Sequence, residues 1–136
     1  MQKKDLIAAF NIQFMELWDD VLRVFPKDTE IRAGRLVVKG VLHVSQTKIY
    51  RTFKQSVYDL YSDKIMEGDL EYFLEKKYDD DVKSLDSGVL SKIDSLRDPI
   101  RRMDKADKET FTSYMQNLCK LVEAAEAAGK EGVERE

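Results

Sequence analysis

The sequence has little of three residue types that shape small proteins: cysteine, proline and glycine. It contains one cysteine, two prolines and six glycines in 136 residues. A single cysteine excludes an intramolecular disulfide and is typical of a reducing compartment. Scarce proline and glycine favour helices with few turns. The length suits one domain and is enough to bury a core without a disulfide or a metal.

Long apolar runs are also missing. No run approaches the roughly 20 apolar residues that a bilayer-spanning helix needs. Near the start of the chain, the polar residues Asn11 and Gln13 interrupt the apolar stretch, so no signal-peptide pattern is present. We therefore expect a protein that is not secreted and does not bind a membrane.

The residue types that carry most catalysis and metal binding are scarce as well. His43 is the single histidine, and a general base or a zinc site normally needs partner residues. Cys119 lies within an apolar stripe and is expected to pack as a small hydrophobe. Asp79, Asp80 and Asp81 are consecutive, whereas calcium loops place their oxygen ligands at alternate positions. We predict no catalytic residue, no metal site and no cofactor, and a protein that is not an enzyme.

Charge, by contrast, is plentiful and segregated, although the net charge is only −3. A basic block runs from residue 32 to residue 54 and contains no acid. Ten acids follow between residues 59 and 86, against four lysines. Such blocks can contact each other or a charged partner, or simply form solvated surfaces. The basic block consists of Arg32, Arg35, Lys39, Lys48, Arg51 and Lys54.

Apolar residues recur at three- and four-residue intervals along most of the chain, which predicts helices. Pro26 should end the first helix, because proline disfavours helical geometry in the residue before it. Asp28, Ser45 and Asp69 are suited to cap the next three helices, and either Asp104 or Asp107 the last. In the second helix we expect Leu36 among the core-facing residues, and in the third Leu60 and Tyr61. The expected helices cover roughly residues 6–25, 28–43, 45–67, 69–78, 89–103 and 104–124.

The sequence therefore predicts an all-α fold, a compact single-domain bundle of five or six helices spanning residues 1–124. Residues 79–88 read as a loop, and Pro99 should either kink a helix or begin a new one. Residues 125–136 are small and charged, which predicts a frayed or disordered tail. The expected core residues are Phe10, Phe14, Leu17, Trp18, Phe53, Val57, Phe73, Ile93, Leu96, Phe111 and Leu118.

The stretch from residue 58 to residue 81 carries four of the six tyrosines around one glycine, Gly68. Because one helix should end near Gly68 and the next begin directly after it, their aromatic side chains can meet across a short turn. Four acids surround this glycine, and packing does not explain them. We call these residues the acidic turn and expect them to bind a basic surface, either the basic block or a protein partner. The acidic turn consists of Asp63, Glu67, Asp69 and Glu71.

Residues 36–54 resemble the turn and second helix of a helix-turn-helix DNA reader, with Ser45 as the cap of a basic helix. Lys48, Arg51 and Lys54 would then contact phosphates. Lys39 argues against this interpretation, since the first helix needs a small residue at that crossing, and the whole chain is acidic. The alternative is an ordinary packing corner between two helices.

Four phrases of the sequence occur in an order that resembles a known family. They are VFPKDTEI (24–31), YSDKIMEGDLEYFLEKKY (61–78), IDSLRDPI (93–100) and YMQNL (114–118). Together they are similar to a small, largely uncharacterised helical family encoded by large nucleocytoplasmic DNA viruses, over roughly residues 6 to 122. The resemblance implies a viral product that acts in the cytoplasm or nucleus of an infected host cell or is packaged in the virion. It implies no functional residues.

These observations lead to a hypothesis of a non-enzymatic helical interaction protein. We expect a viral structural or virion-associated component, of the minor capsid type, that works through contacts with a protein partner such as other virion proteins. A DNA-binding regulator that uses the helix-turn-helix-like segment is the alternative. A viral mimic that binds a host protein is a third interpretation, which the sequence does not separate from the first.

Overall fold

The computed structural model describes residues 2–75 and 96–135, and these residues form helices without any strand. The predicted all-α single-domain fold is confirmed. Residues 48–66 form one continuous helix, because α3, the π-helical turn η1 and α4 follow one another without a break. The helices are α1 (Lys3–Val24), α2 (Thr29–Val44), α3 (Lys48–Phe53), η1 (Lys54–Tyr58), α4 (Asp59–Met66), α5 (Leu70–Glu75), α8 (Arg97–Arg101) and α9 (Lys105–Arg135).

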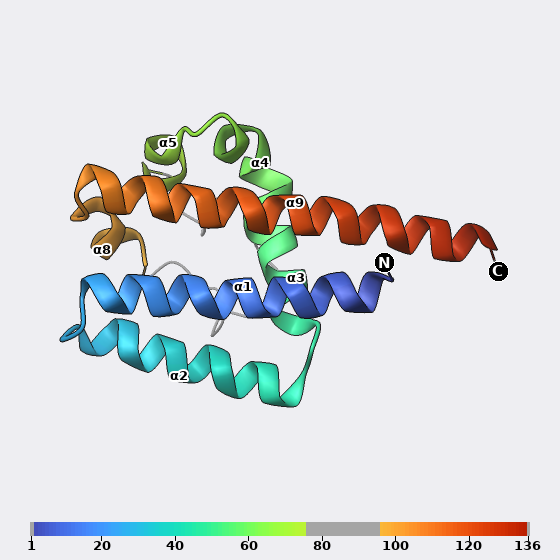
Figure 1. Cartoon of the computed structure of the whole chain (residues 1–136), viewed down its shortest axis with the longest axis horizontal. Helices are drawn as coiled ribbons and strands as arrows, with labels where there is room; N and C mark the ends of the chain where they lie inside the picture. The colour runs from blue at the N-terminus through green and yellow to red at the C-terminus, as the bar shows by residue number, and fades with distance from the viewer. Residues whose placement is uncertain (1, 76–95, 136) are drawn as a thin grey trace.

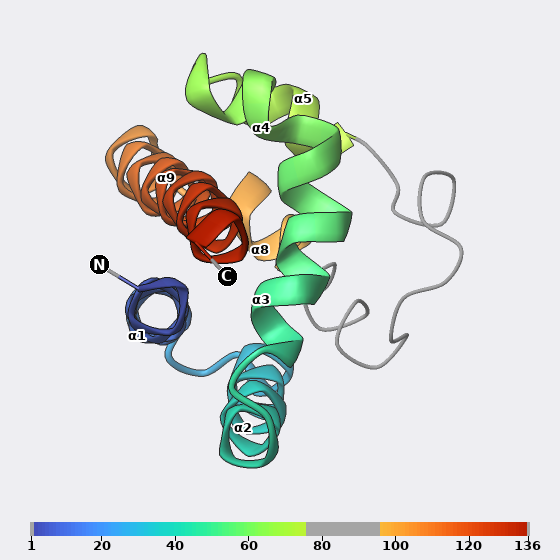
Figure 2. The ribbon, with the colours of Figure 1, turned by 90° about the vertical axis from the view of Figure 1, so that its right-hand side faces the viewer.

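Three long helices run side by side, with α1 between α2 and α9 (Figure 1). The continuous helix α3–η1–α4 crosses them on one side (Figure 2). Its α3 end lies near α2, and its α4 end lies beyond α9, next to α5. As a result, α2 and α4 lie at opposite edges of the molecule.

An aromatic cluster fills the space where α1 crosses α3. The Phe10 ring centroid lies 5.4 Å from that of Tyr50 and 5.2 Å from that of Phe53, both edge to face. Edge-to-face pairs of this kind stabilise a core beyond the area that they bury. The side chain of Phe73 and the whole of residue Ile93 lie outside the part of the chain that the structure describes. The predicted core residues that the structure confirms as buried are Phe10, Phe14, Leu17, Trp18, Phe53, Val57, Leu96, Phe111 and Leu118.

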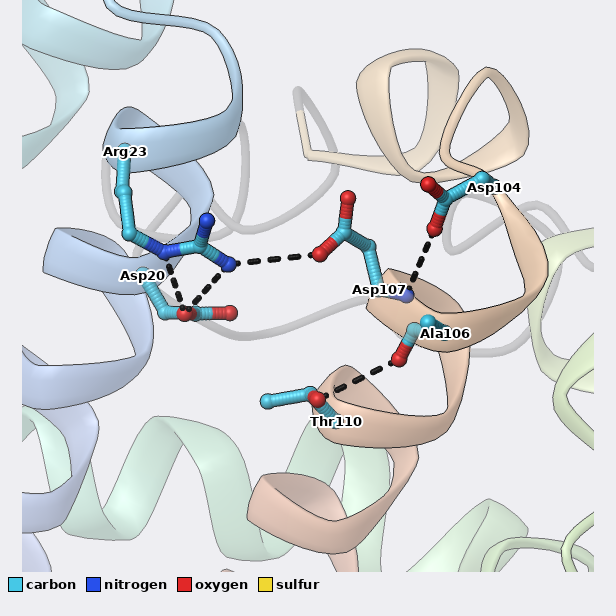
Figure 3. A network of polar contacts seen from close by, with 6 residues as sticks. All are labelled: Asp20, Arg23, Asp104, Ala106, Asp107 and Thr110. Carbon is cyan, nitrogen blue, oxygen red and sulfur yellow. Dashed lines mark hydrogen bonds and ion pairs between the residues drawn. The ribbon is translucent and has the colours of Figure 1, made fainter.

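Asp28, Asp69 and Asp104 cap α2, α5 and α9 as expected, whereas α3 has Thr47 at its N-cap position, two residues after the expected Ser45, and no side-chain cap there. Asp28 Oδ1 accepts hydrogen bonds from the backbone N–H groups of Glu30 and Ile31, at 2.9 and 3.1 Å. Asp104, rather than Asp107, caps α9, since its Oδ1 accepts from the Asp107 N–H at 2.8 Å. The Asp107 side chain instead accepts a hydrogen bond from Arg23 at 3.2 Å (Figure 3). Arg23 also donates to Asp20, so this network ties the end of α1 to the start of α9.

Two residues expected in the core face outward instead. Leu36 is 62% exposed, because the inner stripe of α2 runs through Ile31, Gly34 and Val38. Leu60 is 41% exposed, and Tyr61 alone of that pair is buried. The reason is η1: a π-helical turn holds more residues than an α-helical turn, so the residues that follow it are rotated relative to α-helical register.

The start of α8 and the end of α9 also differ in detail from the boundaries expected from the sequence. Helix α8 begins at Arg97, two residues before Pro99, so that the proline lies in the first turn, where it is tolerated. Helix α9 continues to Arg135, and Ala125 is fully buried, so helical packing extends past the expected boundary at residue 124. The expected loop at residues 79–88 lies outside the described residues. So does the expected helix from residue 89, as far as residue 95.

Candidate functional site

The acidic turn owes its shape to Gly68, which has a φ of +83°. Its N–H donates to the Ile65 carbonyl at 2.9 Å, and the N–H of Asp69 donates to the Lys64 carbonyl at 2.8 Å. This pair of bonds is a Schellman motif, which satisfies the last carbonyls of a helix and favours glycine at the left-handed position. Asp69 Oδ1 then accepts from the N–H of Tyr72 at 3.1 Å and caps α5, as predicted. One of the four acids therefore has a structural role.

The aromatic side chains on either side of the turn do meet. The Tyr61 and Tyr72 ring centroids are 6.3 Å apart with an interplanar angle of 67°. The ammonium group of Lys64 lies 5.4 Å from the centroid of the Tyr72 ring, within the range of a cation–π contact. Packing of α5 back onto α4 thus depends on these rings.

The cations nearest to the acidic turn come from α4 and α9, not from the basic block. Lys108 Nζ lies 3.7 Å from a carboxylate oxygen of Glu71, and Lys64 Nζ lies 3.7 Å from one of Glu67. An open groove of about 690 Å³ separates the turn from α9. Asp63 is exposed and forms no ion pair with any residue that the structure describes. The exposed ion pairs of Glu67 and Glu71 contribute at most about 1 kcal/mol each, so the acids of the turn remain available to a partner.

The basic block is divided between α2 and the start of α3. Arg35 Nε lies 2.5 Å from Asp19 Oδ1, and Arg32 donates a hydrogen bond to the Pro26 carbonyl. Lys39 and Arg51 are exposed and have no ion-pair partner within residues 2–75 and 96–135. None of these cations contacts a residue of the acidic turn.

The helix-turn-helix-like segment is tied to α1 by a hydrogen bond at its turn. Buried Asn11 donates to the Gln46 carbonyl at 2.9 Å, and Ser45 Oγ accepts from the N–H of Lys48 at 3.2 Å. Arg51 is exposed, Lys48 is half-buried, and Lys54 Nζ lies 3.1 Å from Asp59 Oδ1. The three predicted phosphate-contacting residues therefore share one side of the helix, but the acid Asp59 lies among them. The remaining positions of α3, namely Ile49, Tyr50, Thr52 and Phe53, are buried.

A second surface was not predicted from the sequence: the outward face of α2. Leu36 is 62% exposed and Val44 is 89% exposed, while a Cβ added to Gly40 would meet nothing within 4 Å. Cations lie along one edge of this apolar strip, and no acid lies in it. The sequence contained a signal for this exposed face, because the spacing of Leu36 relative to Ile31 and Val38 does not fit the buried stripe of α2. We define the outer face of α2 by its exposed residues, Arg32, Ala33, Leu36, Val37, Lys39, Gly40, His43 and Val44.

A polar contact between distant parts of the chain was also missed. The buried Tyr50 hydroxyl donates to Glu126 Oε2 at 2.6 Å, and Lys3 Nζ lies 3.2 Å from the same oxygen. Burial, reinforced by this carboxylate, raises the pKa of Tyr50. Partial burial alone would raise the pKa of Glu126, but the hydrogen bonds from Tyr50 and Lys3 outweigh it and lower that pKa. Seventy-six residues separate Tyr50 from Glu126, so no local pattern could indicate the pair.

Cys119 packs in the core, as its place in an apolar stripe predicted. Cys119 is buried, and burial raises the pKa of its thiol to about 12, so the nucleophilic thiolate is suppressed. His43 is exposed in the last turn of α2. Among the described residues, no three histidine, cysteine or acidic side chains are grouped as metal ligands would be. None of the helices in this part of the chain is both long and apolar enough to span a bilayer.

The fold and its surfaces define a class: a single-domain all-α protein with a basic, apolar face on α2 and an acidic turn after α4. Comparisons with protein-family models, with curated proteins and with solved structures find no match to the chain. Arguments about its function therefore depend on its own residues.

Proposed function

We propose that this protein is a non-enzymatic interaction module, a viral structural or virion-associated component that works through protein–protein contacts. The observation that carries the proposal is the outer face of α2. Leu36, Val37 and Val44 present an apolar strip to solvent on a helix whose other side packs against α1. Contiguous exposed apolar surface beside polar residues is typical of an interaction site.

The size of the effect is sufficient for a specific contact. Full burial of one valine or leucine side chain contributes about 1.5–3 kcal/mol. Leu36 and Val44 retain most of their exposure, so covering both would contribute about 2–5 kcal/mol before the losses of association. Lys39 and Arg32 at the edge of the strip would add selectivity for an acidic partner more than affinity.

The viral context comes from the sequence resemblance, which implies a virion or an infected cell. Quantitative mass spectrometry of purified particles of the encoding virus tests it. The proposal predicts a copy number comparable to that of minor structural proteins. Absence from the particles, or turnover of common phosphate, peptide or sugar substrates by the purified chain at enzymatic rates, would contradict it.

DNA binding is a competing function with a specific observation in its favour, the exposed Arg51 beside the turn in which Ser45 Oγ accepts a hydrogen bond from the Lys48 N–H. Non-specific DNA affinity rises steeply as salt falls, because phosphate contacts release counterions. Binding of duplex DNA that survives physiological salt and is lost in a Lys48→Ala, Arg51→Ala double variant would favour this function. No binding even at low salt would eliminate it.

A further inference from the structure

We propose that the outer face of α2 binds a second copy of this chain, through the exposed face of its α4. This inference rests on the proposed function and names the partner. The exposed residues that form the matching surface are Leu60, Asp63 and Met66 of α4 and its C-cap residue, Glu67.

The two faces have the same design with opposite charge. On α2, exposed Leu36 and Val44 lie beside Arg32 and Lys39, with no acid between residues 31 and 58. On α4, Leu60 and Met66 are 41% and 44% exposed.

The acids of α4 lie at helical spacing with those apolar side chains. Leu60, Asp63 and Glu67 follow one another at three- and four-residue steps, so they share one side of the helix. Each face therefore offers an apolar strip with charge at its edge, basic on α2 and mainly acidic on α4, where Lys64 Nζ lies 3.7 Å from Glu67. Complementary charge of this kind fixes partner choice and register between two helices.

Within one molecule, the two faces do not meet. Helices α2 and α4 lie at opposite edges, joined by the length of α3 and η1 (Figure 2). No ion pair joins Lys39 to the rest of the described chain, and the same holds for Asp63. Each face is therefore left for another molecule.

The position of the faces determines the kind of assembly. Because the α2 and α4 faces lie at opposite edges of one molecule, the α2 face of one copy meets the α4 face of the next without the reverse contact forming in the same pair. The contact is therefore heterologous, and each bound copy presents another free face. Such contacts form rings when the rotation closes and open chains when it does not. This is the behaviour expected of a component that lines or links a larger shell.

Gly40 favours a close contact at the middle of the α2 face. A Cβ at this position would meet no atom of its own chain within 4 Å, so no internal packing explains the glycine. A glycine in a helix interior is less favourable than alanine, because it loses more backbone freedom on folding. Small residues let two helices approach more closely than larger residues allow, which fits an approaching α4.

Sedimentation of the full chain at increasing concentration tests the inference. We expect the weight-average mass to rise above the monomer value of 15.8 kDa as the concentration increases from about 1 μM to about 1 mM. Raising the salt from about 0.15 M to about 1 M shortens the Debye length from about 8 Å to about 3 Å and should weaken the association. A mass that stays at the monomer value throughout would overturn the inference.

Charge reversal identifies the surfaces. Lys39→Glu and Asp63→Lys should each weaken association about tenfold or more, and a chain carrying both changes should recover much of it. The matched controls are Lys120→Glu and Glu123→Lys, which reverse exposed charges on α9 and should leave the mass unchanged. Equal loss in controls and test variants, or no recovery in the double variant, would contradict the pairing of α2 with α4.

Other occupants of the α2 face give different results. If the wild-type chain stays monomeric but binds vesicles rich in phosphatidylserine, and Lys39→Glu abolishes that binding, a lipid surface covers the face and the inference fails. The proposed function has its own readout, the copy number in particles. A monomer that is nevertheless abundant in particles would disprove self-association and leave the proposed function intact.

Discussion

Gly34 and Gly40 lie on opposite sides of α2, and the structure predicts opposite effects when each is replaced by alanine. A Cβ at Gly34 would lie 2.7 Å from Trp18 Cη2 and 2.8 Å from Cζ3. Trp18 is fully buried, so its rigid ring has no free space into which to move. At Gly40 the added methyl group would point into solvent. Both substitutions remove the same backbone flexibility from the unfolded chain.

The magnitudes follow from two opposing terms. Alanine in place of glycine in a helix interior stabilises by about 0.5–1 kcal/mol, and at Gly40 this is the whole effect. At Gly34 the overpacking against Trp18 costs about 1–3 kcal/mol, which exceeds that gain. We expect Gly34→Ala to be less stable than Gly40→Ala by about 1–3 kcal/mol. For a domain of this size that difference lowers the melting temperature by roughly 4–10 °C.

Urea unfolding followed by tryptophan fluorescence measures this difference directly, because Trp18 is the single tryptophan of the chain. The measurement is made at low concentration so that self-association does not contribute. Equal stabilisation by the two substitutions would refute the reasoning, since it would show that α1 and α2 do not approach closely at Gly34.

Three further predictions concern the buried polar and reactive groups. Cys119 should resist alkylation in the folded protein and react fully in urea, because burial raises its pKa to about 12; rapid labelling of the native state would show that it is accessible. Tyr50→Phe should destabilise the protein by about 1–2 kcal/mol in urea unfolding through loss of the hydrogen bond to Glu126, whereas Tyr58→Phe should change it by less than about 0.5 kcal/mol. Stability should fall as pH rises above about 9, because the unfolded chain releases the protons of Cys119 and Tyr50 near their ordinary pKa values of 9.0 and 10.0 while the folded chain retains them. Tyr50→Phe should make that decline shallower, and an unchanged slope would mean that Tyr50 is not held protonated by the fold.

Sequence patterns located several helix ends because those ends carry their own local chemistry. Asp28 caps α2, and Gly68 closes α4 with a left-handed residue, as short-range rules require. The three- and four-residue spacing of residues such as Phe10, Phe14 and Leu17 likewise determines which side of a helix is buried. Local rules do not depend on the rest of the fold.

The remaining features depend on tertiary packing. The π-helical turn at η1 rotates the residues after it, which is why Leu60 is exposed while Tyr61 is buried. The fit of Gly34 against Trp18 requires two helices to approach, and the sequence alone showed only a weak helix former. The turn at Gly68 was correctly located, whereas partner binding by its acids stays a prediction, and the Lys108 that pairs with Glu71 lies on a helix far along the chain. Charge segregation in the sequence therefore indicated charged surfaces without indicating which of them meet.

The central claim is that this protein acts through contacts made by the outer face of α2. If the chain is the virion component proposed above, the most direct measurement compares the incorporation of two variants into purified particles of that virus, by quantitative mass spectrometry. Leu36→Asp places a charge on the face, and Ile12→Asp places one at an equally exposed site on α1, since the two side chains are 62% and 61% exposed. We predict that Leu36→Asp reduces incorporation about tenfold or more and that Ile12→Asp is incorporated like the wild type, with both variants folded. Normal incorporation of Leu36→Asp, or equal loss of both variants, would contradict the claim.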